Sequence, residues 1–440
     1  MPKDVKFIID RLHEAGFEAY AVGGCVRDSI LGREPDDWDI TTSARPLEIK
    51  KLFRPTIDTG LQHGTVTVLR NHVGYEVTTY RIDGIYEDGR HPKDVTFTSD
   101  LKEDLLRRDF TINAMAYNDE EGLIDEYDGL RDIENKIIRC VGDPVERFTE
   151  DALRMMRAVR FAAQLGYEID ENTKNAVKEL FPRLKMISAE RIQVELCKLI
   201  LSDNPAHLRI AYELGITSVV LPEFDVCMEQ EQNHIHHCYS VGEHILHSME
   251  NIEADRALRY TMLFHDIAKP ECRTLDDKGK EHYHGHDIRS AEMAHSIMKR
   301  LKFDNDTLRA VETLVKSHDL DIADDPRSVR RAMNRLGKEL FPQLLKVKRA
   351  DVLAQSDYMR EEKLALLDRL TSLYDDIMAK GEGVTIADLA INGSDIIALG
   401  VKPGPGVGDI LKELLELVLE DPGKNQRDLL LEEARTAIAE

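Results

Sequence analysis

The spacing of apolar residues changes character near residue 140. Before that point, short runs rich in β-branched and aromatic residues, at 19–22, 65–70 and 75–81, are separated by glycines and an Asn-His pair. This pattern is typical of strands joined by turns. From Pro144 onward the apolar residues recur at helical spacing, as in "ALRMMRAVRFAAQLG" and "AERIQVELCKLIL". We therefore predict an α+β chain, in which a mixed α/β head precedes an all-α remainder.

Turn residues divide the helical part further. They cluster near Asn204-Pro205, at 228–234 and at Gly381 to Gly383. The chain has 440 residues, of which 42% are hydrophobic, and a domain of about 150 residues is a common size. We expect a head at 1–140, a helical neck and body at 141–230, a further helical domain at 231–360 and a C-terminal helical tail at 361–440.

Charge and cysteine usage narrow the choice of partners and compartment. The net charge of -23 argues against a general nucleic-acid coat, because non-specific binding needs Lys and Arg to neutralise phosphates. The acidic excess is strong at 361–440, whereas 141–210 is neutral, so a polyanion should meet the middle of the chain. The six scattered cysteines form no CxxC pair, and no apolar run approaches the roughly 18 residues of a membrane span. We expect a cytoplasmic protein that does not enter membranes.

The first candidate site begins where the predicted strand at 19–22 ends. Gly23-Gly24 predicts a tight turn into a helix, and the N–H groups at a helix N-terminus attract anions. Arg27 would add positive charge at the same place. The alternative is an ordinary strand-to-helix turn.

Two aspartates follow at a spacing that favours a metal. In "DDWDI" a strand would alternate its faces, so that Asp37 and Asp39 project the same way. Adjacent carboxylates repel each other unless a cation lies between them, and Mg²⁺ prefers carboxylates together with substrate phosphate oxygens. Glu76, in the run "YEVTTYR", can supply a third carboxylate. The alternative is a solvated acidic edge strand.

The order "GGCVRD" and then "DWD" resembles the signature of the class II nucleotidyltransferases, which include tRNA CCA-adding enzymes and bacterial poly(A) polymerases. These enzymes add nucleotides to an RNA 3′ end. In such sites two metals activate the attacking hydroxyl and stabilise the departing pyrophosphate. The resemblance therefore implies that Asp37, Asp39 and Glu76 are catalytic and that the two aspartates bind Mg²⁺.

Further motifs occur in the family's order. "RRDFTINA" at 107–114 is similar to the family's ribose-binding element, which implies that Asp109 accepts the ribose 2′-hydroxyl and that Arg108 lies near the phosphates. "SAERIQVELCKLIL" at 188–201 is similar to a helix-stabilising element, so we interpret Glu190 and Arg191 as structural. The implied nucleotide-binding set is Gly23, Gly24, Arg27, Arg108, Asp109, Asn113, Asp151, Arg154 and Arg157.

"EDALRMMR" at 150–157 resembles the family's base-selecting element. On a helix, Asp151 and Arg154 would share a face, with Arg157 one turn further. The carboxylate can accept from the exocyclic amino group of cytosine or adenine while the guanidinium donates to the ring, as a Watson–Crick partner would. The alternative is a surface ion pair.

A short loop motif bears on which nucleotides are added. "DGRHP", formed by Asp88, Gly89, Arg90, His91 and Pro92, is similar to a flexible loop that helps the family's site change from CTP to ATP. Relatives that add only the two cytidines lack this loop. Its presence favours complete CCA addition.

Histidines gather in a second candidate site. Of the 16 histidines, 11 lie between residues 234 and 318, and clustered imidazoles indicate a metal. His244, His265-Asp266 and the distant Asp351 resemble the HD phosphohydrolase superfamily, whose divalent metal activates water. Two further histidines, His284 and His286, can complete such a site, whereas His234, His236, His237 and His247 are assigned to its surroundings. Buried core histidines or polar helix ends are the alternative.

These resemblances cover nearly the whole chain, including the tail "INGSDIIALGVKPGPGVGDILKELL", which is similar to the ends of bacterial CCA-adding enzymes with an HD domain. They imply a nucleotidyltransferase that uses CTP and ATP, with Mg²⁺ in the head and an unspecified divalent metal in the HD domain at 231–360. The tRNA acceptor arm would lie along the neck and body. Three alternatives are a poly(A) polymerase, against which the acidic tail argues, a non-catalytic RNA-binding protein, and an HD hydrolase whose head only binds nucleotide.

Overall fold

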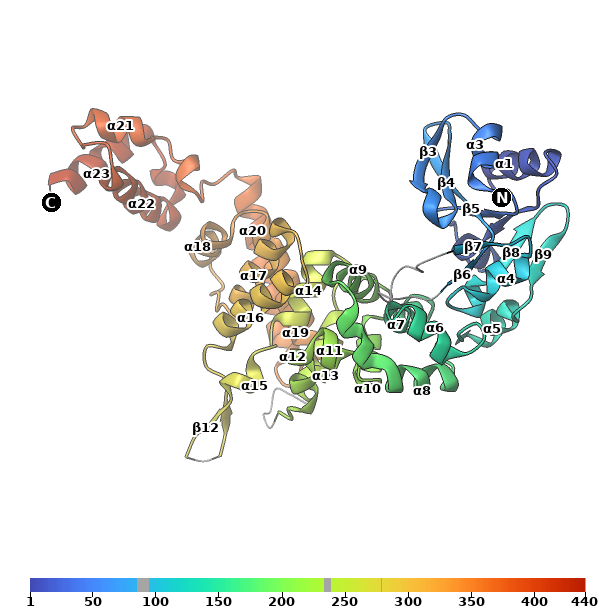
Figure 1. Cartoon of the computed structure of the whole chain (residues 1–440). Coiled ribbons are helices and arrows are strands. Elements are labelled where there is room, and N and C mark those ends of the chain that lie inside the picture. Colours follow the sequence, from blue (N-terminus) through green and yellow to red (C-terminus); the bar gives the residue numbers. More distant parts are fainter. Residues whose placement is uncertain (85–94, 233–238, 278, 440) are drawn as a thin grey trace. The chain divides into compact units, whose positions relative to one another are not determined.

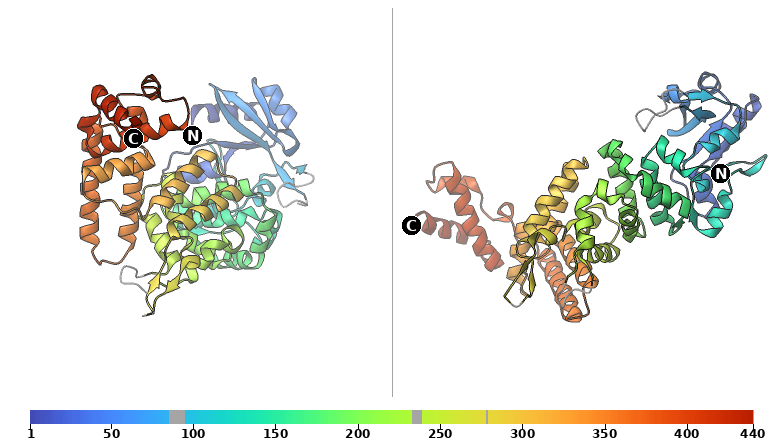
Figure 2. Two further views of the ribbon diagram at one scale, coloured as in Figure 1. Left: turned by 90° about the vertical axis from the view of Figure 1, so that its left-hand side faces the viewer. Right: turned by 60° about the horizontal axis from the view of Figure 1, so that its bottom comes forward.

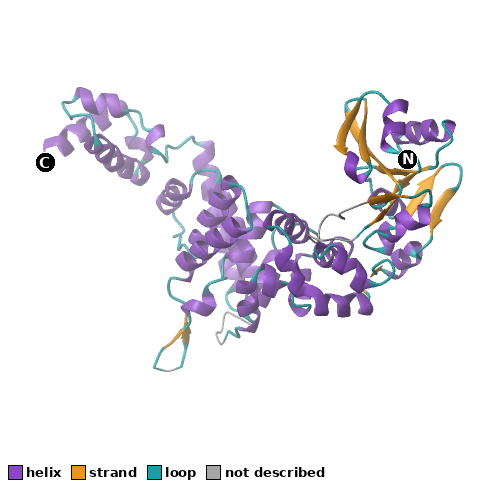
Figure 3. Cartoon of the chain, viewed as in Figure 1, coloured by secondary structure: helices purple, strands orange, loops and turns teal. Residues whose placement is uncertain are grey.

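A computed structural model describes residues 1–84, 95–232, 239–277 and 279–439 of the chain (Figure 1). Two compact units are present, Met1–Asp225 and Val226–Glu440. Among the described residues, strands longer than two residues lie in the first unit, and helices make up most of the second (Figure 3). The predicted fold class, a mixed α/β head followed by a helical remainder, is therefore confirmed.

A seven-stranded sheet organises the head, with the strand order β3-β4-β5-β2-β1-β8-β9. Only the β2–β5 pair is parallel, and the other neighbours are antiparallel. The strands are β1 (Ala19–Val22), β2 (Asp39–Thr42), β3 (Thr56–Gly60), β4 (Thr65–Arg70), β5 (Val73–Thr79), β8 (Met115–Asn118) and β9 (Gly122–Asp125); β6 (Arg81–Asp83) pairs with β7 (Val95–Phe97) outside this sheet.

Short helices and a buried apolar cluster complete the head. Tyr20 and Val22 of β1 pack with Ala116 of β8 and with Leu105. Leu105 lies in the helix that precedes "RRDFTINA", so this cluster connects that motif to strand β1. The head helices are α1 (Lys3–Glu14), α2 (Gly24–Ile30), α3 (Pro46–Leu52), α4 (Leu101–Leu106) and α5 (Gly129–Asn135).

The rest of the first unit is helical apart from the two-residue parallel pair β10 (Ile137–Ile138) and β11 (Glu168–Ile169). Helix α7 is its centre because nine of its side chains are buried, and it ends at Gly166, whose φ is +68°. The helices are α6 (Pro144–Glu150), α7 (Leu153–Leu165), α8 (Glu171–Leu180), α9 (Ala189–Ile200), α10 (Leu208–Glu213) and α11 (Thr217–Val220), and α12 (Pro222–Glu229) continues from this unit into the second.

Helix α14 is the core of the second unit. Its residues from Leu258 to Phe264 are all buried, as expected of a helix surrounded by other helices, and it contacts α13, α16, α17 and α19. A short hairpin, β12 (Thr274–Leu275) with β13 (Glu281–His282), projects from these helices (Figure 2). The helices are α13 (Val241–Glu250), α14 (Arg256–Phe264), α15 (Lys269–Cys272), α16 (His286–Arg300), α17 (Asn305–Ser317), α18 (Pro326–Leu336), α19 (Leu340–Ala354), α20 (Arg360–Ala379), α21 (Gly393–Ala398), α22 (Pro405–Glu420) and α23 (Arg427–Ala439).

Candidate functional sites in the two units

Three acidic residues influence one another electrostatically at the start of β2. Asp39 is the first residue of β2 and pairs with Val22 at the end of β1, while Ile40 pairs with Val77 of β5, so that Glu76 lies beside Asp39. The pKa of Asp39 is raised to about 6. Loss of hydration is the main cause, and the negative charges of Asp37 and Glu76 act in the same direction. The guanidinium of Arg108 lowers the pKa but does not offset them. A cation placed here would relieve this repulsion.

The strand prediction for "DDWDI" was wrong in one respect. Strand β2 begins only at Asp39, so Asp37 precedes it and strand alternation does not set its direction. Both aspartates are exposed. The negative charge of Asp37 nevertheless contributes to the raised pKa of Asp39, so the two carboxylates interact electrostatically.

The turn between β1 and α2 favours glycine at its first position. Gly23 has φ +85° and ψ −131°, a conformation that residues with a Cβ rarely adopt. A Cβ on Gly23 would also lie 3.1 Å from Nη1 of Arg108, and one on Gly24 would lie 3.7 Å from Nη2 of Arg27. The two glycines therefore allow two guanidinium groups to approach the backbone.

Arg27 and Asp109 belong to one buried chain of hydrogen bonds. Arg27, which is 8% exposed, donates from Nη1 to Oδ1 of Asn113 at 2.6 Å, and from Nε and Nη2 to Asp28 at 2.9 Å each. Asn113 donates to Oδ1 of Asp109 at 3.2 Å. Arg157 donates to Oδ2 of Asp109 from Nε at 2.7 Å. Four residues of the predicted nucleotide-binding set are thus in direct contact.

Asp109 is ionised in this setting. Its burial raises the pKa, but the guanidinium groups of Arg157 and Arg154 and the hydrogen bond from Asn113 together hold the pKa of Asp109 below its ordinary value. An ionised carboxylate accepts hydrogen bonds only. It can therefore take a proton donor such as a hydroxyl as a further ligand.

Sequence reasoning missed Asp104, a fully buried carboxylate beneath this site. It accepts from Nη2 of Arg107 at 2.8 Å and from Oγ1 of Thr41 in β2 at 3.0 Å, and Nη2 of Arg108 lies 3.5 Å away. Asp104 thereby fixes the arginine pair of "RRDFTINA" against the strand that carries Asp39. An aspartate three and four residues before two arginines was the available signal.

The segment "EDALRMMR" at 150–157 differs from its predicted conformation. Asp151 has φ −140° and lies between α6 and α7, so Asp151 and Arg154 do not share a helix face. Asp151 instead accepts from both terminal nitrogens of Arg191, at 2.6 and 3.3 Å. Arg154 donates to Glu150 at 2.6 Å and to the carbonyl of Arg107 at 2.8 Å. The interpretation of Arg191 as structural agrees with this contact, which spans 40 residues of sequence.

The loop motif of Asp88 to Pro92 lies outside the residues that the structure describes, as do His234, His236 and His237. His247 is partly exposed and contacts Glu250 at 2.9 Å, in agreement with its assignment to the surroundings of the cluster. Within the described ranges, no helix is both long and apolar enough to cross a membrane.

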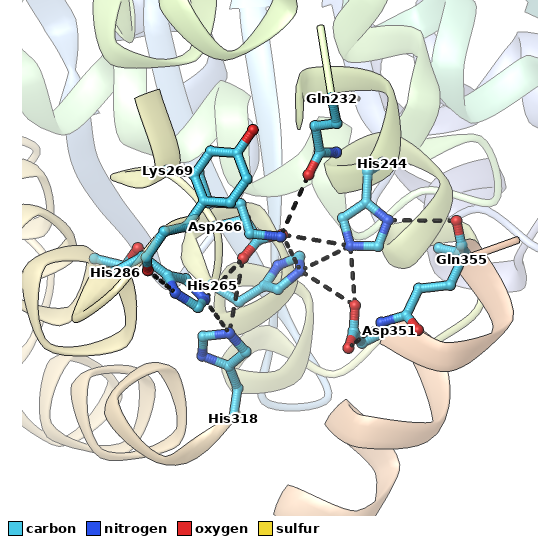
Figure 4. Close-up of polar contacts among 12 residues, drawn as sticks. Gln232, His244, His265, Asp266, Lys269, His286, His318, Asp351 and Gln355 are labelled. Atoms are coloured by element: carbon cyan, nitrogen blue, oxygen red, sulfur yellow. Dashed lines mark hydrogen bonds and ion pairs between the residues drawn. The ribbon is translucent and has the colours of Figure 1, made fainter. Parts of the chain in front are cut away.

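The histidine cluster of the second unit brings together four predicted ligands (Figure 4). Nε2 of His244 lies 3.2 Å from Nε2 of His265, 2.9 Å from Oδ1 of Asp351 and 3.5 Å from Oδ2 of Asp266. Three of the four residues are almost fully buried. They come from α13, from the end of α14 and from α19, which pack against one another.

Two more histidines adjoin Asp266. His286 begins α16 and His318 follows α17, and their Nε2 atoms lie 3.4 and 3.7 Å from Oδ1 of Asp266. His286 agrees with its prediction, whereas His318 was not singled out from the sequence. His284 lines the adjoining open cavity of about 380 Å³, together with Lys269 and Lys363.

The cluster balances its charges internally. Burial raises the pKa of Asp266, but His265 and Lys269 hold it well below its usual range, and His244 and His265 do the same for Asp351. Burial lowers the pKa of His265, but the two carboxylates outweigh this effect and raise that pKa to about 10. Burial lowers the pKa of His318 to about 3. Two ionised carboxylates among imidazoles form a donor set suited to Zn²⁺, Mn²⁺ or Fe²⁺.

Comparison with known proteins covers the whole chain. The family model "Poly A polymerase head domain" matches residues 19–139, "Probable RNA and SrmB- binding site of polymerase A" matches 166–228, and "tRNA nucleotidyltransferase domain 2 putative" matches 287–434. The CCA-adding enzyme of Pediococcus pentosaceus is 35% identical over 430 residues, which are 98% of this chain and 96% of the relative.

A further relative and a solved structure are also CCA-adding enzymes. The CCA-adding enzyme of Lactiplantibacillus plantarum is 36% identical over 436 residues, covering 98% of this chain and 95% of the relative. The crystal structure of the Bacillus stearothermophilus CCA-adding enzyme in complex with CTP has a TM-score of 0.74 and 28% identity, with both chains fully covered. This protein therefore belongs to the family of CCA-adding enzymes.

Proposed function

We propose that this protein adds C, C and A to the 3′ end of tRNA from CTP and ATP, without a nucleic-acid template. The observation that carries the proposal is that the charges of Asp37 and Glu76 act on Asp39 at the start of β2, in a chain that is similar, over 98% of its length, to CCA-adding enzymes. The relative from Bacillus stearothermophilus was crystallised with CTP.

In this proposal Asp37 and Asp39 hold Mg²⁺, and Glu76 adds negative charge beside them. Bound Mg²⁺ would neutralise phosphate charge and activate the 3′-hydroxyl of the tRNA. The exposed position of both aspartates supports the assignment, because the metal must also reach substrate oxygens. Mg²⁺ commonly binds through one or two carboxylates together with phosphates.

The incoming nucleotide is proposed to lie along the neighbouring cationic residues. Arg108 would contact the phosphates beside Gly23 and Gly24, and Asp109 would accept the ribose 2′-hydroxyl. The proposed support for Asp109 is the chain of Arg27, Asn113 and Arg157, which fixes the carboxylate's direction.

Base selection is proposed for Asp151 and Arg154. Each carboxylate oxygen has two lone pairs, so Asp151 can accept from an exocyclic amino group while it remains bound to Arg191. Where cytosine and adenine have this amino group, uracil and guanine have a carbonyl oxygen, which a carboxylate would repel. The acceptor arm of tRNA would contact residues 141–230, of which 141–210 contain equal numbers of acidic and basic residues.

An extension assay tests this function. The protein is incubated with tRNA that lacks its CCA end and with each labelled NTP in turn, and the products are separated at single-nucleotide resolution. We expect two additions from CTP, followed by one from ATP. Long adenosine runs would instead indicate a poly(A) polymerase, and bound but unextended tRNA would indicate a non-catalytic RNA-binding protein.

We propose a second activity, a metal-dependent phosphohydrolase, for the histidine cluster. The specific observation that favours it is that His244, His265, Asp266 and Asp351 gather ligand atoms within a few ångströms in a buried place. A divalent metal held there would supply an activated water. We expect hydrolysis of 2′,3′-cyclic phosphates or 2′-nucleotides, measured as released 3′-nucleotide or phosphate. An absence of hydrolysis with every divalent metal tried would contradict this proposal.

A further inference from the structure

A second cavity of the helical unit lies beside the one that adjoins the histidine cluster. It has a volume of about 430 Å³, and its lining includes Tyr239, His247 of α13, Asn251 at the end of that helix, and the segment that joins α19 to α20. This volume is within the range of small-molecule sites. We propose that this cavity, here named the base pocket, binds the adenine of a nucleotide whose phosphate is hydrolysed at the histidine cluster. The proposal rests on the phosphohydrolase function proposed for that cluster.

Two stacked rings form one wall of the base pocket. The ring centroids of Tyr239 and His247 are 4.3 Å apart, with an angle of 37° between the ring planes. Nδ1 of His247 lies 2.9 Å from Oε2 of Glu250, and this contact holds the imidazole in place. Tyr239 is 38% exposed, so part of its ring remains accessible to a planar ligand. Every nucleobase has a π-face that can stack on such a ring.

Asn251 supplies the hydrogen-bonding groups that favour adenine. Its Nδ2 donates to the carbonyl oxygen of His247 at 2.8 Å, which fixes the amide in the wall of the base pocket. An asparagine amide has two hydrogens on its nitrogen and an acceptor oxygen, so a second hydrogen and Oδ1 can contact a ligand. Such an amide pairs with adenine by accepting from N6 and donating to N7. The polar chemistry of this wall therefore matches an adenine edge.

Gln355 connects the base pocket to the histidine cluster, because it lines both this pocket and the cavity next to the cluster. Its Nε2 donates to Oδ2 of Asp351 at 2.9 Å (Figure 4), and its Oε1 accepts from Nζ of Lys363 at 2.6 Å. Ala354, which also lines the base pocket, has its carbonyl oxygen 3.3 Å from Nδ1 of His244. The two cavities therefore adjoin at Gln355.

The charges of the two cavities differ in a way that suits the two ends of a nucleotide. Lys269 and Lys363 line the cavity next to the cluster, so positive charge is present there for a phosphate. In the base pocket, Arg360 is paired with Asp357 at 2.5 Å, which leaves that pair neutral overall. Because ribose separates the base of a nucleotide from its phosphate, one molecule can place its phosphate at the cluster and its base on Tyr239. The expected substrate class is therefore an adenosine 2′-phosphate or 2′,3′-cyclic phosphate.

Steady-state kinetics with two matched substrates tests the proposal. The full chain is assayed with Mn²⁺ on adenosine 2′,3′-cyclic phosphate and on methyl riboside 2′,3′-cyclic phosphate, in which a methyl group replaces the base. In both, water adds to phosphorus, the P–O2′ bond breaks and O2′ takes a proton. We expect Tyr239→Ala to raise the KM for the adenosine substrate at least about fivefold, since stacking on an aromatic ring contributes that much. The kcat, and kcat/KM for the base-free substrate, should stay within about twofold.

Further variants test the choice of base and provide a control. Asn251→Ala should reduce the preference for the adenosine over the uridine 2′,3′-cyclic phosphate at least about fivefold, because a two-hydrogen-bond base contact discriminates by this much or more. Tyr358→Ala is the control, because Tyr358 is a tyrosine of similar exposure, 46%, in the segment between α19 and α20 but is not a lining residue of the base pocket. It should change neither parameter. Circular dichroism confirms that each variant is folded.

The remaining outcomes separate the base pocket from the phosphohydrolase function. An unchanged KM in Tyr239→Ala, or an equal loss with the base-free substrate, would overturn the base pocket and leave the phosphohydrolase proposal standing. If neither substrate is hydrolysed, equilibrium dialysis with labelled adenosine 2′-phosphate decides the matter. Equal binding by the unaltered chain and by Tyr239→Ala would then overturn both proposals, whereas binding at least about fivefold weaker in Tyr239→Ala would overturn the hydrolysis alone.

Discussion

At the scale of single residues, the proposed nucleotidyltransferase site depends on carboxylates whose surroundings differ. Asp39 has its pKa raised to about 6 by loss of hydration and by neighbouring negative charge, whereas arginines hold the pKa of Asp109 below its ordinary value. The first carboxylate is therefore suited to a cation, and the second to a hydrogen-bond donor on a substrate.

Asp37→Ala and Asp39→Ala should each abolish addition of C and of A while leaving tRNA binding within about twofold. A catalytic metal contributes several kcal/mol, and each 1.36 kcal/mol is tenfold in rate, so we expect at least about a 100-fold loss. Extension and filter-binding assays measure the two effects. Asp36→Ala, an exposed neighbour, is the control and should remain active. Undiminished incorporation by either variant would refute the metal assignment.

Substitutions at Asp151 should change which nucleotide is chosen and not only the rate. A bidentate base contact provides about 1–3 kcal/mol of discrimination, which is roughly 5- to 150-fold. Asp151→Ala should lose that much preference for CTP over UTP in kcat/KM. Arg191→Ala should shift selectivity in the same direction, because Arg191 orients the carboxylate at 2.6 Å, and Lys198→Ala, exposed on the same helix, should not. Unaltered selectivity at a lower rate would indicate a purely structural ion pair.

At the scale of elements, turns and helix ends place the chemistry. The β1–α2 turn brings Gly23 to Arg108, and the end of α14 brings His265 and Asp266 into the histidine cluster. In both cases the functional group follows directly after a buried element, so its position depends on the packing of that element.

Gly23→Ala should reduce nucleotide addition more than it reduces stability. The conformation of Gly23, with φ +85° and ψ −131°, costs a residue with a Cβ about 1–3 kcal/mol, and the new methyl group would displace Nη1 of Arg108, 3.1 Å away. Gly32→Ala is the matched control, because Gly32 has φ +68° but no atom within 4 Å of its Cβ. Both variants should lose similar stability in urea unfolding, while only Gly23→Ala should raise the KM for CTP. Equal activity of the two would contradict the role of the turn.

Leu263→Ala should destabilise the second unit by about 2–5 kcal/mol, because it removes a fully buried side chain from α14. Urea denaturation, followed by circular dichroism, measures the shift. Ile288→Ala, at a position that is 51% exposed on α16, should change the free energy of unfolding by less than about 0.5 kcal/mol. Similar effects of the two substitutions would contradict the central place of α14.

At the scale of the whole molecule, the two sites belong to separate compact units. The three carboxylates of the head lie within Met1–Asp225, and the histidine cluster lies within Val226–Glu440. Each unit contains its own buried core, so a local change in one set of ligands need not alter the other.

His265→Ala and Asp266→Ala should therefore eliminate phosphohydrolase activity while CCA addition stays within about twofold. Loss of a metal ligand removes the activated water on which hydrolysis depends. Both activities are measured on the same preparation, with circular dichroism as the check on folding. Asp37→Ala should show the reverse pattern. A parallel loss of both activities in a folded variant would refute the independence of the sites.

The outcome of the sequence predictions depended on the range of the interactions involved. The strands near 19–22, 65–70 and 75–81 and the helical character of the chain after Pro144 were predictable, because periodicity and turn residues act over a few positions. The start of β2 at Asp39 and the extended conformation of Asp151 were not, because local patterns seldom fix the ends of elements. The motifs nevertheless identified the family that the comparisons show.

Taken alone, the sequence determined the α+β class, the family and most residues of both candidate sites, because residue types and short spacings carry that information. The tertiary structure decided which of them meet. Parallel pairing of β2 with β5 places Glu76 beside Asp39, Arg191 reaches Asp151 across 40 residues, and the packing of α16 on α17 joins His286 to His318. These contacts form because strands and helices that are distant in the sequence pack their apolar faces together. The residues that flank Asp151, Glu76 or His318 in the sequence do not indicate which distant residue each of them will contact.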